Sequence, residues 1–273
     1  MTMAISSDAK FERPRECRMP AFRVAGNLYF VGNTSGASWL LDTAAGPVLF
    51  DTNYPTLAPL LLESIREAGF RPESVAAIFH THGHYDHYGA TDQIKALSGA
   101  PTYMSKADAR MLRQRPEMGL AHLGKYIFPA PPVTDVELED EDVITIGGVP
   151  IRCVTCPGHT PGAMSFFFPV TEDGKTYTAA IHGGSGLNTV ARSFMEAYGV
   201  DWRQDFVNSI EKLMPEKVDI FLANHTKVCH TAQKYQQLLQ GENAFIDSDL
   251  WQSFLKSLRD DFETMCLQEQ GAE

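Results

Sequence analysis

The sequence predicts an α/β protein (α+β) in which two β-sheets pack face to face with helices on the outside. Its 273 residues are 44% hydrophobic, enough to bury one large core, and chains of this length often form one unit. Segments typical of strands are followed by segments typical of helices twice along the chain, an order that indicates layered sheets covered by helices. We therefore expect one domain over residues 1–273, with an N-terminal extension at 1–21 and a C-terminal helix at 243–273.

The first half of the chain begins with strands and ends with helices. Short apolar segments separated by turn residues predict strands at 27–33, 37–43 and 46–52. A helix follows, with Thr56 as its cap and Gly69 at its C-terminal stop. Next, SVAAIFH (74–80) predicts a buried strand that leads into a cluster of histidines, and TDQIKALSG (91–99) predicts a helix.

The second half repeats this order. Strands joined by tight turns are predicted at VITI (143–146), VPIRCVTC (149–156), AMSFFFPV (163–170) and TYTAAIH (176–182). A helix over 201–214 and a buried strand, VDIFLA (218–223), come next. An apolar stripe over 251–265 predicts the C-terminal helix, which we expect to cover a sheet rather than to bind a partner.

One connection, at residues 113–132, is longer than most loops of compact domains. It is rich in Pro and carries Met118, Leu120, His122 and Phe128. Loops of this length are often lids or binding loops. The sequence leaves two interpretations open, a loop that faces a substrate and a loop that only crosses the surface.

Composition and charge disfavour several classes of function. The formal charge is −11 and the pI is near 5.3, without a long run of Lys and Arg, so nucleic acid is not an expected partner. No apolar stretch is as long as a signal peptide or a membrane span, so a membrane is not expected either. We expect a monomer acting on a small molecule. As written the chain predicts a cytoplasmic protein, and a periplasmic or secreted one if it is a processed mature form.

Five cysteines at irregular spacing argue against a disulfide framework and favour a reducing compartment. Cys153 and Cys156 form a C-x-x-C pattern on a predicted strand. Because strand positions three apart face opposite sides, we interpret them as small core residues and not as a chelating or redox pair.

The segment FHTHGHYDHYGA (79–90) places four histidines and an aspartate within eight positions. In an extended chain, residues two apart face the same way, which puts His82, His84 and Asp86 on one side, joined by His87 if the chain turns there. A single tetrahedral ion has four ligands and usually takes them from at least two segments. Four candidate ligands in one short stretch therefore favour two ions, with further ligands from other segments. The pattern also differs from H-E-x-x-H, which requires a helix.

Two later histidines occupy positions that such a site requires. His159, in CPGHTPGA, follows a strand on a turn with Gly158 and Gly162, whose small size would let the backbone pass close to a metal. His225, in VDIFLANHTK, follows another strand. Either one alone is more typical of an ordinary polar residue. Their shared position at strand ends predicts the missing ligands.

Together, THGHYDH, PGHTPG and a late strand ending in His resemble the signature of the metallo-β-lactamase fold. Order and spacing match from about Phe22 to Met265, nearly the whole chain. The resemblance implies a four-layer αβ/βα sandwich with a zinc site at one edge. It also implies two sets of metal ligands, His82, His84 and His159 for the first zinc and Asp86, His87 and His225 for the second.

One departure narrows the subclass. Most hydrolases of the superfamily, such as glyoxalase II and the lactonases, carry an aspartate bridging both metals where this chain has Gly184, Ser185 and Gly186. The missing bridge, a His instead of a Cys at the second metal, and the tail GENAFIDSDLW resemble the third (B3) subclass of metallo-β-lactamases. This implies that Ser185 lies near a substrate carboxylate. Asp51 resembles the aspartate that braces the ligand loop, a turn aspartate being the alternative.

The remaining histidines are not predicted to be ligands. His182 shares a strand face with Gly184 and could approach the metals, but we favour a hydrogen-bonded core histidine. His80 and His122 are excluded as well. His230 follows the same strand as His225, but five residues further on we expect it at the next helix.

Two zinc ions sharing a water would lower the pKa of that water towards about 7, giving hydroxide at neutral pH. We expect this hydroxide to open a β-lactam ring, with His82 and His84 on the zinc that polarises the carbonyl and Asp86 helping to orient the water. The prediction is an antibiotic-resistance hydrolase that cleaves a cyclic amide C–N bond. The alternative is a cytosolic zinc hydrolase of a lactone, thioester or other amide, with weak or no lactamase activity.

Other classes that share the motif fit less well. A flavo-diiron redox protein has a glutamate where His84 stands and keeps the bridging aspartate. A non-catalytic zinc module is expected to have lost ligands, whereas all six positions are filled here. Nuclease relatives are disfavoured by the acidic balance and the missing bridge.

Overall fold

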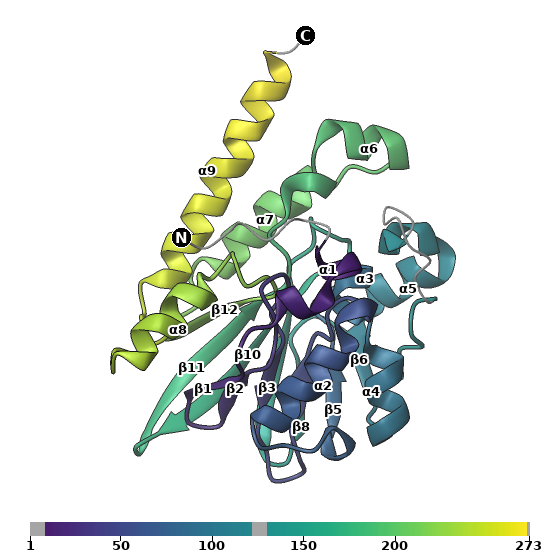
Figure 1. Cartoon of the computed structure of the whole chain (residues 1–273). Helices are drawn as coiled ribbons and strands as arrows, with labels where there is room; N and C mark the ends of the chain where they lie inside the picture. The colour runs from purple at the N-terminus through teal and green to yellow at the C-terminus, as the bar shows by residue number, and fades with distance from the viewer. Residues whose placement is uncertain (1–8, 122–129, 272–273) are drawn as a thin grey trace.

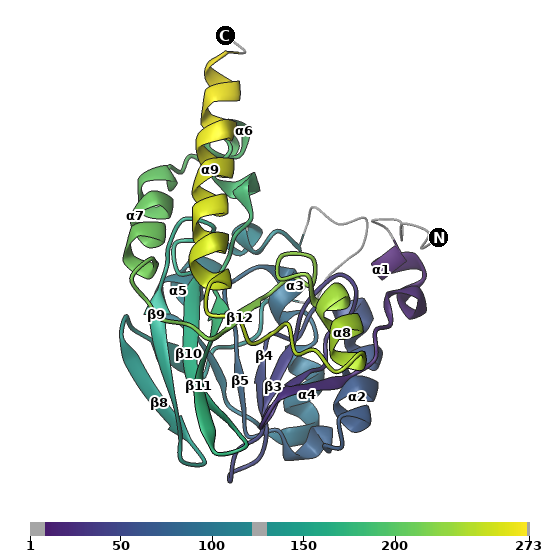
Figure 2. The same ribbon diagram turned by 90° about the vertical axis from the view of Figure 1, so that its left-hand side faces the viewer.

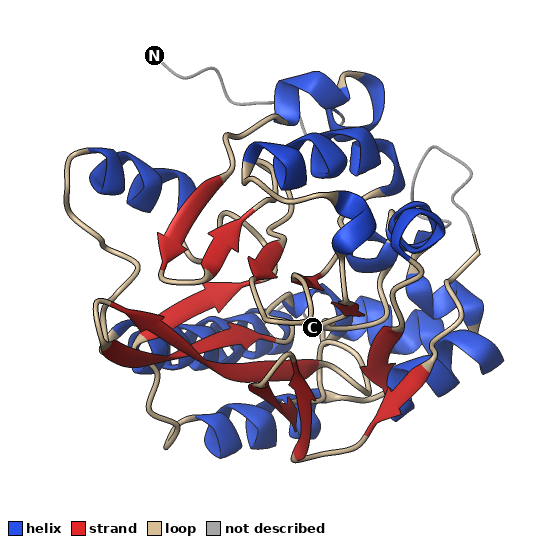
Figure 3. Cartoon of the chain, turned by 90° about the horizontal axis from the view of Figure 1, so that it is seen from below, coloured by secondary structure: helices blue, strands red, loops and turns tan. Residues whose placement is uncertain are grey.

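A computed structural model describes residues 9–121 and 130–271. Two β-sheets lie face to face in this part of the chain, with helices on their outer sides (Figures 1 and 3). This arrangement confirms the predicted four-layer αβ/βα sandwich. None of the helices in this part of the chain combines the length and the apolar character that crossing a bilayer requires.

The first sheet has seven strands in sequence order, antiparallel from β1 to β4 and parallel from β4 to β7. The turn expected between the strand segments 37–43 and 46–52 is present, since Gly46 N donates to Thr43 O at 3.0 Å. The strands are β1 Phe22–Ala25, β2 Leu28–Phe30, β3 Trp39–Leu41, β4 Val48–Phe50, β5 Ala77–Phe79, β6 Thr102–Ser105 and β7 Val136–Leu138.

The second sheet has five strands in the order β12-β11-β10-β9-β8, and Figure 2 shows it beside β3 to β5 of the first. Only the β11–β12 pair is parallel among these described strands. The strands are β8 Asp142–Ile146, β9 Val149–Thr155, β10 Met164–Glu172, β11 Lys175–His182 and β12 Ile220–Ala223.

Both faces of the central strands β3 to β6 of the first sheet are buried. Phe50 and Phe79 point into the main core between the sheets. Their neighbours Leu49 and Ile78 point the other way, into a cluster under helices α2 (Ala58–Glu67) and α4 (Thr91–Ser98). Burial on both sides explains why these strands are apolar runs without alternation.

Helices α7 (Arg203–Leu213) and α9 (Leu250–Gln270) cover the second sheet. Phe166 faces inward, 5.4 Å from Phe50 between ring centroids, whereas Phe167 faces outward, 5.6 Å from Trp251 of α9. The C-terminal helix therefore covers a sheet, as predicted. The helix begins at Leu250 and not at residue 243. The Asn243 amide nitrogen donates to Val24 O and its oxygen accepts from Phe245 N, and these bonds hold the chain before the helix in a turn.

The helix predicted with Thr56 as its cap starts differently. Pro55–Leu57 form a 3-10 turn and α2 begins at Ala58. The Thr56 hydroxyl instead donates to Lys10 O at 2.7 Å, which ties the N-terminal extension to the domain. Gly69, with φ of +92°, lies just past the helix end, as predicted.

Several elements have no counterpart in the sequence predictions. Strands β1, β6 and β7 read FRVA, TYMS and VEL, without the apolar run that marks other short strands such as β4 (VLF) and β5 (AIF). Helix α8 (Thr231–Leu239) is not one of them, because a helix was expected after His230. The unpredicted helices are α1 Ala9–Glu12, α3 Tyr85–Tyr88, α5 Lys106–Gln114 and α6 Arg192–Tyr198, with short 3-10 turns at Pro14–Cys17, Pro72–Ser74, Pro116–Gly119 and Leu187–Thr189.

The cysteine interpretation is confirmed for the C-x-x-C pair. Cys153 and Cys156 are both buried in the main core. All five cysteines are free thiols.

Candidate metal centre

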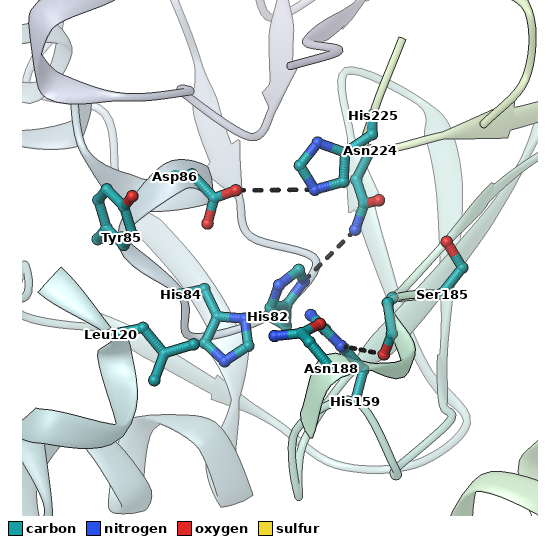
Figure 4. Close-up of a pocket in the computed structure, with 12 residues that line it drawn as sticks. His82, His84, Tyr85, Asp86, Leu120, His159, Ser185, Asn188, Asn224 and His225 are labelled. Atoms are coloured by element: carbon teal, nitrogen blue, oxygen red, sulfur yellow. Dashed lines mark hydrogen bonds and ion pairs between the residues drawn. The ribbon is translucent and has the colours of Figure 1, made fainter. Parts of the chain in front are cut away.

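The predicted ligand residues gather at one edge of the sandwich, beyond the ends of β5, β9 and β12. Figure 4 shows His82, His84 and Asp86 from one segment around a pocket that also receives His159 and His225 from two others. Three segments spread along the chain from His82 to His225 therefore supply one site.

The first segment reaches this site by a turn and not as an extended strand. β5 ends at Phe79, residues 81–84 bend, and Asp86 and His87 lie on the short helix α3. The side chains of His82, His84 and Asp86 do line one pocket, as predicted, but the extended chain that was expected to bring them there is wrong. The turn divides the segment between two neighbouring groups of side chains.

The first triad consists of His82, His84 and His159. Their candidate ligand atoms lie within 4.8 Å of one another. The ring centroids are 4.6 to 4.7 Å apart in every pair, with interplanar angles of 84° to 86°. The three rings are buried and nearly perpendicular to one another, so one nitrogen of each can face a common point between them.

The second triad consists of Asp86, His87 and His225, again with candidate ligand atoms within 4.8 Å. Asp86 Oδ2 lies 3.6 Å from His87 Nε2 and 3.7 Å from His225 Nε2. The His225 side chain is 33% exposed, so this triad is the more open of the two.

Four of the five imidazoles have an acceptor at Nδ1, which places the proton on Nδ1 and leaves the lone pair on Nε2. The acceptors are Gly183 O for His82 (2.9 Å), Gly186 O for His159 (2.8 Å), Ser35 O for His225 (3.2 Å) and Asp51 Oδ2 for His87 (2.7 Å). Nε2 of His82 and of His87 is buried and has no hydrogen-bond partner among the described residues. Imidazoles with free Nε2 atoms, plus one carboxylate, are a donor set that fits zinc.

Burial and charge set the protonation of these groups in opposite directions. Burial lowers the pKa of His82, His84 and His159, the last to about 4, so the first triad is neutral at pH 7. Burial would also lower the pKa of His87, but the Asp86 and Asp51 carboxylates outweigh it and raise that pKa.

Asp51 joins the end of β4 to the second triad. Its carboxylate accepts hydrogen bonds from Thr81 N and Thr81 Oγ1, both at 2.8 Å, and from His87 Nδ1 at 2.7 Å. Asp51 is 1% exposed and has φ of +55°. A turn aspartate would not need these contacts, so the geometry favours the bracing interpretation.

Asp108, on α5, has a comparable place beside the first triad, and the sequence reasoning missed it. It is fully buried and accepts hydrogen bonds from the loops that carry His84 and His159. Burial raises its pKa to about 6, against the lowering effect of these hydrogen bonds. The only sequence signal is the pattern Ser105-x-x-Asp108, which also marks an ordinary helix start.

The glycines around His159 serve packing rather than access to a metal, which corrects that expectation. A Cβ on Gly158 would lie 2.6 Å from Phe206 Cα, and one on Gly162 would lie 2.0 Å from Ser105 Oγ. Packing also requires a glycine at position 184, because a Cβ there would lie 2.8 Å from the His159 ring.

The pocket beside the two triads has a volume of about 240 Å³. Besides the candidate ligands, Ser185 and Asn188 contribute polar groups, and Tyr85 and Leu120 contribute apolar surface. Leu120 comes from the long loop 113–132. Residues 122–129 of that loop, with His122 and Phe128, lie outside the described residues.

The other described histidines lie outside both triads. The His182 ring packs 5.0 Å from that of Phe254, and its Nδ1 accepts from Gly184 N at 3.2 Å. His80 Nε2 lies 2.7 Å from Thr91 Oγ1. His230 is exposed at the start of α8.

Solved structures of known proteins share this fold. FEZ-1, a metallo-β-lactamase from Legionella gormanii, has the same fold with a TM-score of 0.85 and 26% identity, over 93% of this chain and 98% of that one. BJP-1, a subclass B3 metallo-β-lactamase of Bradyrhizobium japonicum, has the same fold with a TM-score of 0.82 and 22% identity, over 94% and 97%.

Curated relatives match over a shorter stretch. A hydroxyacylglutathione hydrolase from Maricaulis maris is 28% identical over 113 residues, 41% of this chain and 36% of that protein. The chain spans about half the length, 49%, of an uncharacterized relative from Aquifex aeolicus that is 36% identical over 40% of this chain. The model of the metallo-β-lactamase superfamily matches residues 31–172, just over half of the sequence. The chain therefore belongs to the metallo-β-lactamase superfamily, as its motifs predicted.

Proposed function

We propose that this protein is a zinc hydrolase with a dinuclear centre that opens the ring of β-lactams. The observation that carries the proposal is the pair of adjacent triads at one pocket, with orphaned Nε2 atoms on His82 and His87. The first triad would hold one ion and the second triad the other. Ions bound there would supply an activated water and polarise the carbonyl.

The protein's own groups prepare this chemistry by holding charge and protons in place. The acceptors at Nδ1 keep four of the imidazoles in the tautomer that can ligate. The Asp86 carboxylate, which the neighbouring His87 and His225 keep ionised against the effect of burial, would ligate the second ion and accept a hydrogen bond from the attacking water. No serine or cysteine nucleophile is required.

Crowding at Gly184 supports the assignment to the B3 type. In the hydrolases with a bridging aspartate, a carboxylate stands in this region of the chain. Here a side chain on Gly184 or Gly186 would approach the His159 ring to within 2.8 Å or 2.7 Å. This crowding at the two glycines supports a centre that holds its ions without the bridging carboxylate.

Polar groups at the pocket rim would bind the substrate carboxylate. Ser185 and Asn188 lie at this rim, close to His159 (Figure 4). Their hydroxyl and amide groups can donate to a carboxylate, while Tyr85 and Leu120 offer apolar contact to the rest of the molecule.

A thioester or lactone is the second candidate substrate. The observation that favours it is the sequence likeness to a hydroxyacylglutathione hydrolase. In that case the same centre would act on an ester-like carbonyl, and lactam cleavage would be weak or absent.

A substrate panel on zinc-loaded protein separates the two candidates. Penicillins, cephalosporins and carbapenems are compared with homoserine lactones and acyl thioesters. We expect lactam turnover, with a raised KM for lactams in Ser185→Ala and no change in the matched control Ser253→Ala on the exposed side of α9. Turnover of thioesters or lactones without any lactam turnover would reject the lactamase assignment.

A further inference from the structure

Asp108 makes contacts that its position on α5 does not require. It is the third residue of the helix, and its backbone N donates to the capping Ser105 Oγ at 3.1 Å. A carboxylate at this position commonly turns back to the backbone amide of the cap. Both oxygens of Asp108 point instead to the two loops that carry the first triad.

Three hydrogen bonds make this connection. Asp108 Oδ2 accepts from Gly83 N and from Thr160 Oγ1, and Oδ1 accepts from Gly162 N, all at 2.7 Å. Gly83 separates two histidines of the first triad, and Thr160 directly follows the third. One carboxylate on α5 therefore joins a loop of the first sheet to a loop of the second.

The buried carboxylate is costly unless these bonds are kept, because an ion loses its hydration when it is buried. Asp108 is 0% exposed, and hydrogen bonds to an ionised acceptor are stronger than neutral ones. The rings of His82 and His159 each have a carbonyl partner of their own. The ring of His84 depends on its backbone, which the bond to Gly83 N holds in place.

We infer that Asp108 is a positioning residue for the first triad, holding the His84 loop and the His159 loop in register so that the three imidazoles can share one ion. Each triad then has its own buried carboxylate, Asp51 for the second and Asp108 for the first. The inference rests on the proposed metal centre.

Zinc titration with a chromophoric chelator as competitor tests this role on the wild type, Asp108→Asn and Asp135→Asn. Asparagine keeps the size of the side chain, but its amide nitrogen cannot accept, so at least one bond is lost. We expect the tighter of the two zinc affinities to fall about 10- to 100-fold in Asp108→Asn. The visible spectrum of the Co²⁺ form should shift too. The control Asp135 also accepts several hydrogen bonds, from Thr102 N and Oγ1 at 2.8 and 2.9 Å, and its variant should bind zinc like the wild type.

The possible outcomes separate this inference from the proposed function. An Asp108→Asn protein with wild-type zinc affinities and Co²⁺ spectrum, changed only in its unfolding temperature, would overturn the positioning role. A wild-type protein that binds no zinc would overturn the proposed function itself. If Asp108→Asn does not fold, Thr160→Val, which removes a single bond at similar volume, is judged by the same two measurements.

Discussion

The two triads offer the same number of candidate ligand atoms but differ in burial and charge. The first consists of three imidazoles that are at most 6% exposed, with pKa values lowered mainly by burial. The second contains a carboxylate, and its His225 side chain is 33% exposed. We therefore expect the two neighbouring triads to differ in their affinities for metal and for protons.

The difference follows from what surrounds each triad. The first is the more deeply buried of the two, and the rings of His82 and His159 are oriented by backbone carbonyls that follow β11. The second lies at the rim, where the Asp51 carboxylate orients His87 and the Ser35 carbonyl orients His225. The carboxylates beside the second triad raise the pKa of His87, so a proton competes with an ion for that ring, whereas burial lowers the pKa values of the first triad and keeps its rings neutral. We therefore expect the first triad to bind its ion more tightly.

The largest effect is expected from His159→Ala, which removes a ring from the buried triad. The rate of hydrolysis should fall more than about 100-fold. Loss of a group that only orients a ligand typically costs about 10- to 100-fold, and loss of a ligand itself should cost more. Metal content should drop from about two ions per chain to about one or fewer. Elemental analysis alongside substrate turnover checks this, with His230→Ala as the matched control. If His159→Ala still binds two ions per chain, His159 is not a metal ligand.

His225→Ala should affect only the second triad. We expect one ion per chain to remain, bound by the first triad, with an activity below that of the wild type but above that of His159→Ala. Elemental analysis after dialysis gives the ion count. If His225→Ala and His159→Ala lose the same number of ions and the same activity, the two triads do not act as separate sites.

Asp51→Asn should weaken the weaker of the two zinc sites by about 10- to 100-fold, because it disturbs the hydrogen bond that orients His87. Competitive zinc titration measures the effect. Asp42→Asn, at the turn after β3, is the control that represents an ordinary turn aspartate. Equal zinc affinities in the two variants would show that Asp51 is an ordinary turn aspartate and does not brace the second triad.

Lowering the pH should release the ion of the second triad before that of the first. A proton and a metal compete for the same imidazole lone pair, and the pKa of His87 is raised while those of the first triad are lowered. Below the pKa of His87, the affinity of the second site should fall roughly tenfold per pH unit, as for exchange of one proton. Zinc titrations between about pH 8 and pH 6 test this. Parallel weakening of both sites would contradict the proposed asymmetry.

Much of the fold could be predicted because its strands are short apolar runs bounded by turn residues. Val48–Phe50 and Ala77–Phe79 are buried on both faces, and such segments are recognisable without partners. Strand β6 was missed since it reads TYMS, and its pairing with β5 and β7 depends on segments far away in the sequence. The start of α2 was misplaced because Thr56 binds Lys10, a contact that local spacing does not contain.

The sequence alone determined the chemistry of the candidate site, since imidazole and carboxylate groups at strand ends are visible in the order of residues. Only the tertiary structure decided how they divide, with the bend at 81–84 directing His82 and His84 to one triad and Asp86 and His87 to the other. It also decided which residues support them. Asp108 meets Gly83 and Gly162 through backbone amides, and a backbone amide is the same in every residue except proline, so no pattern of side chains could reveal that contact.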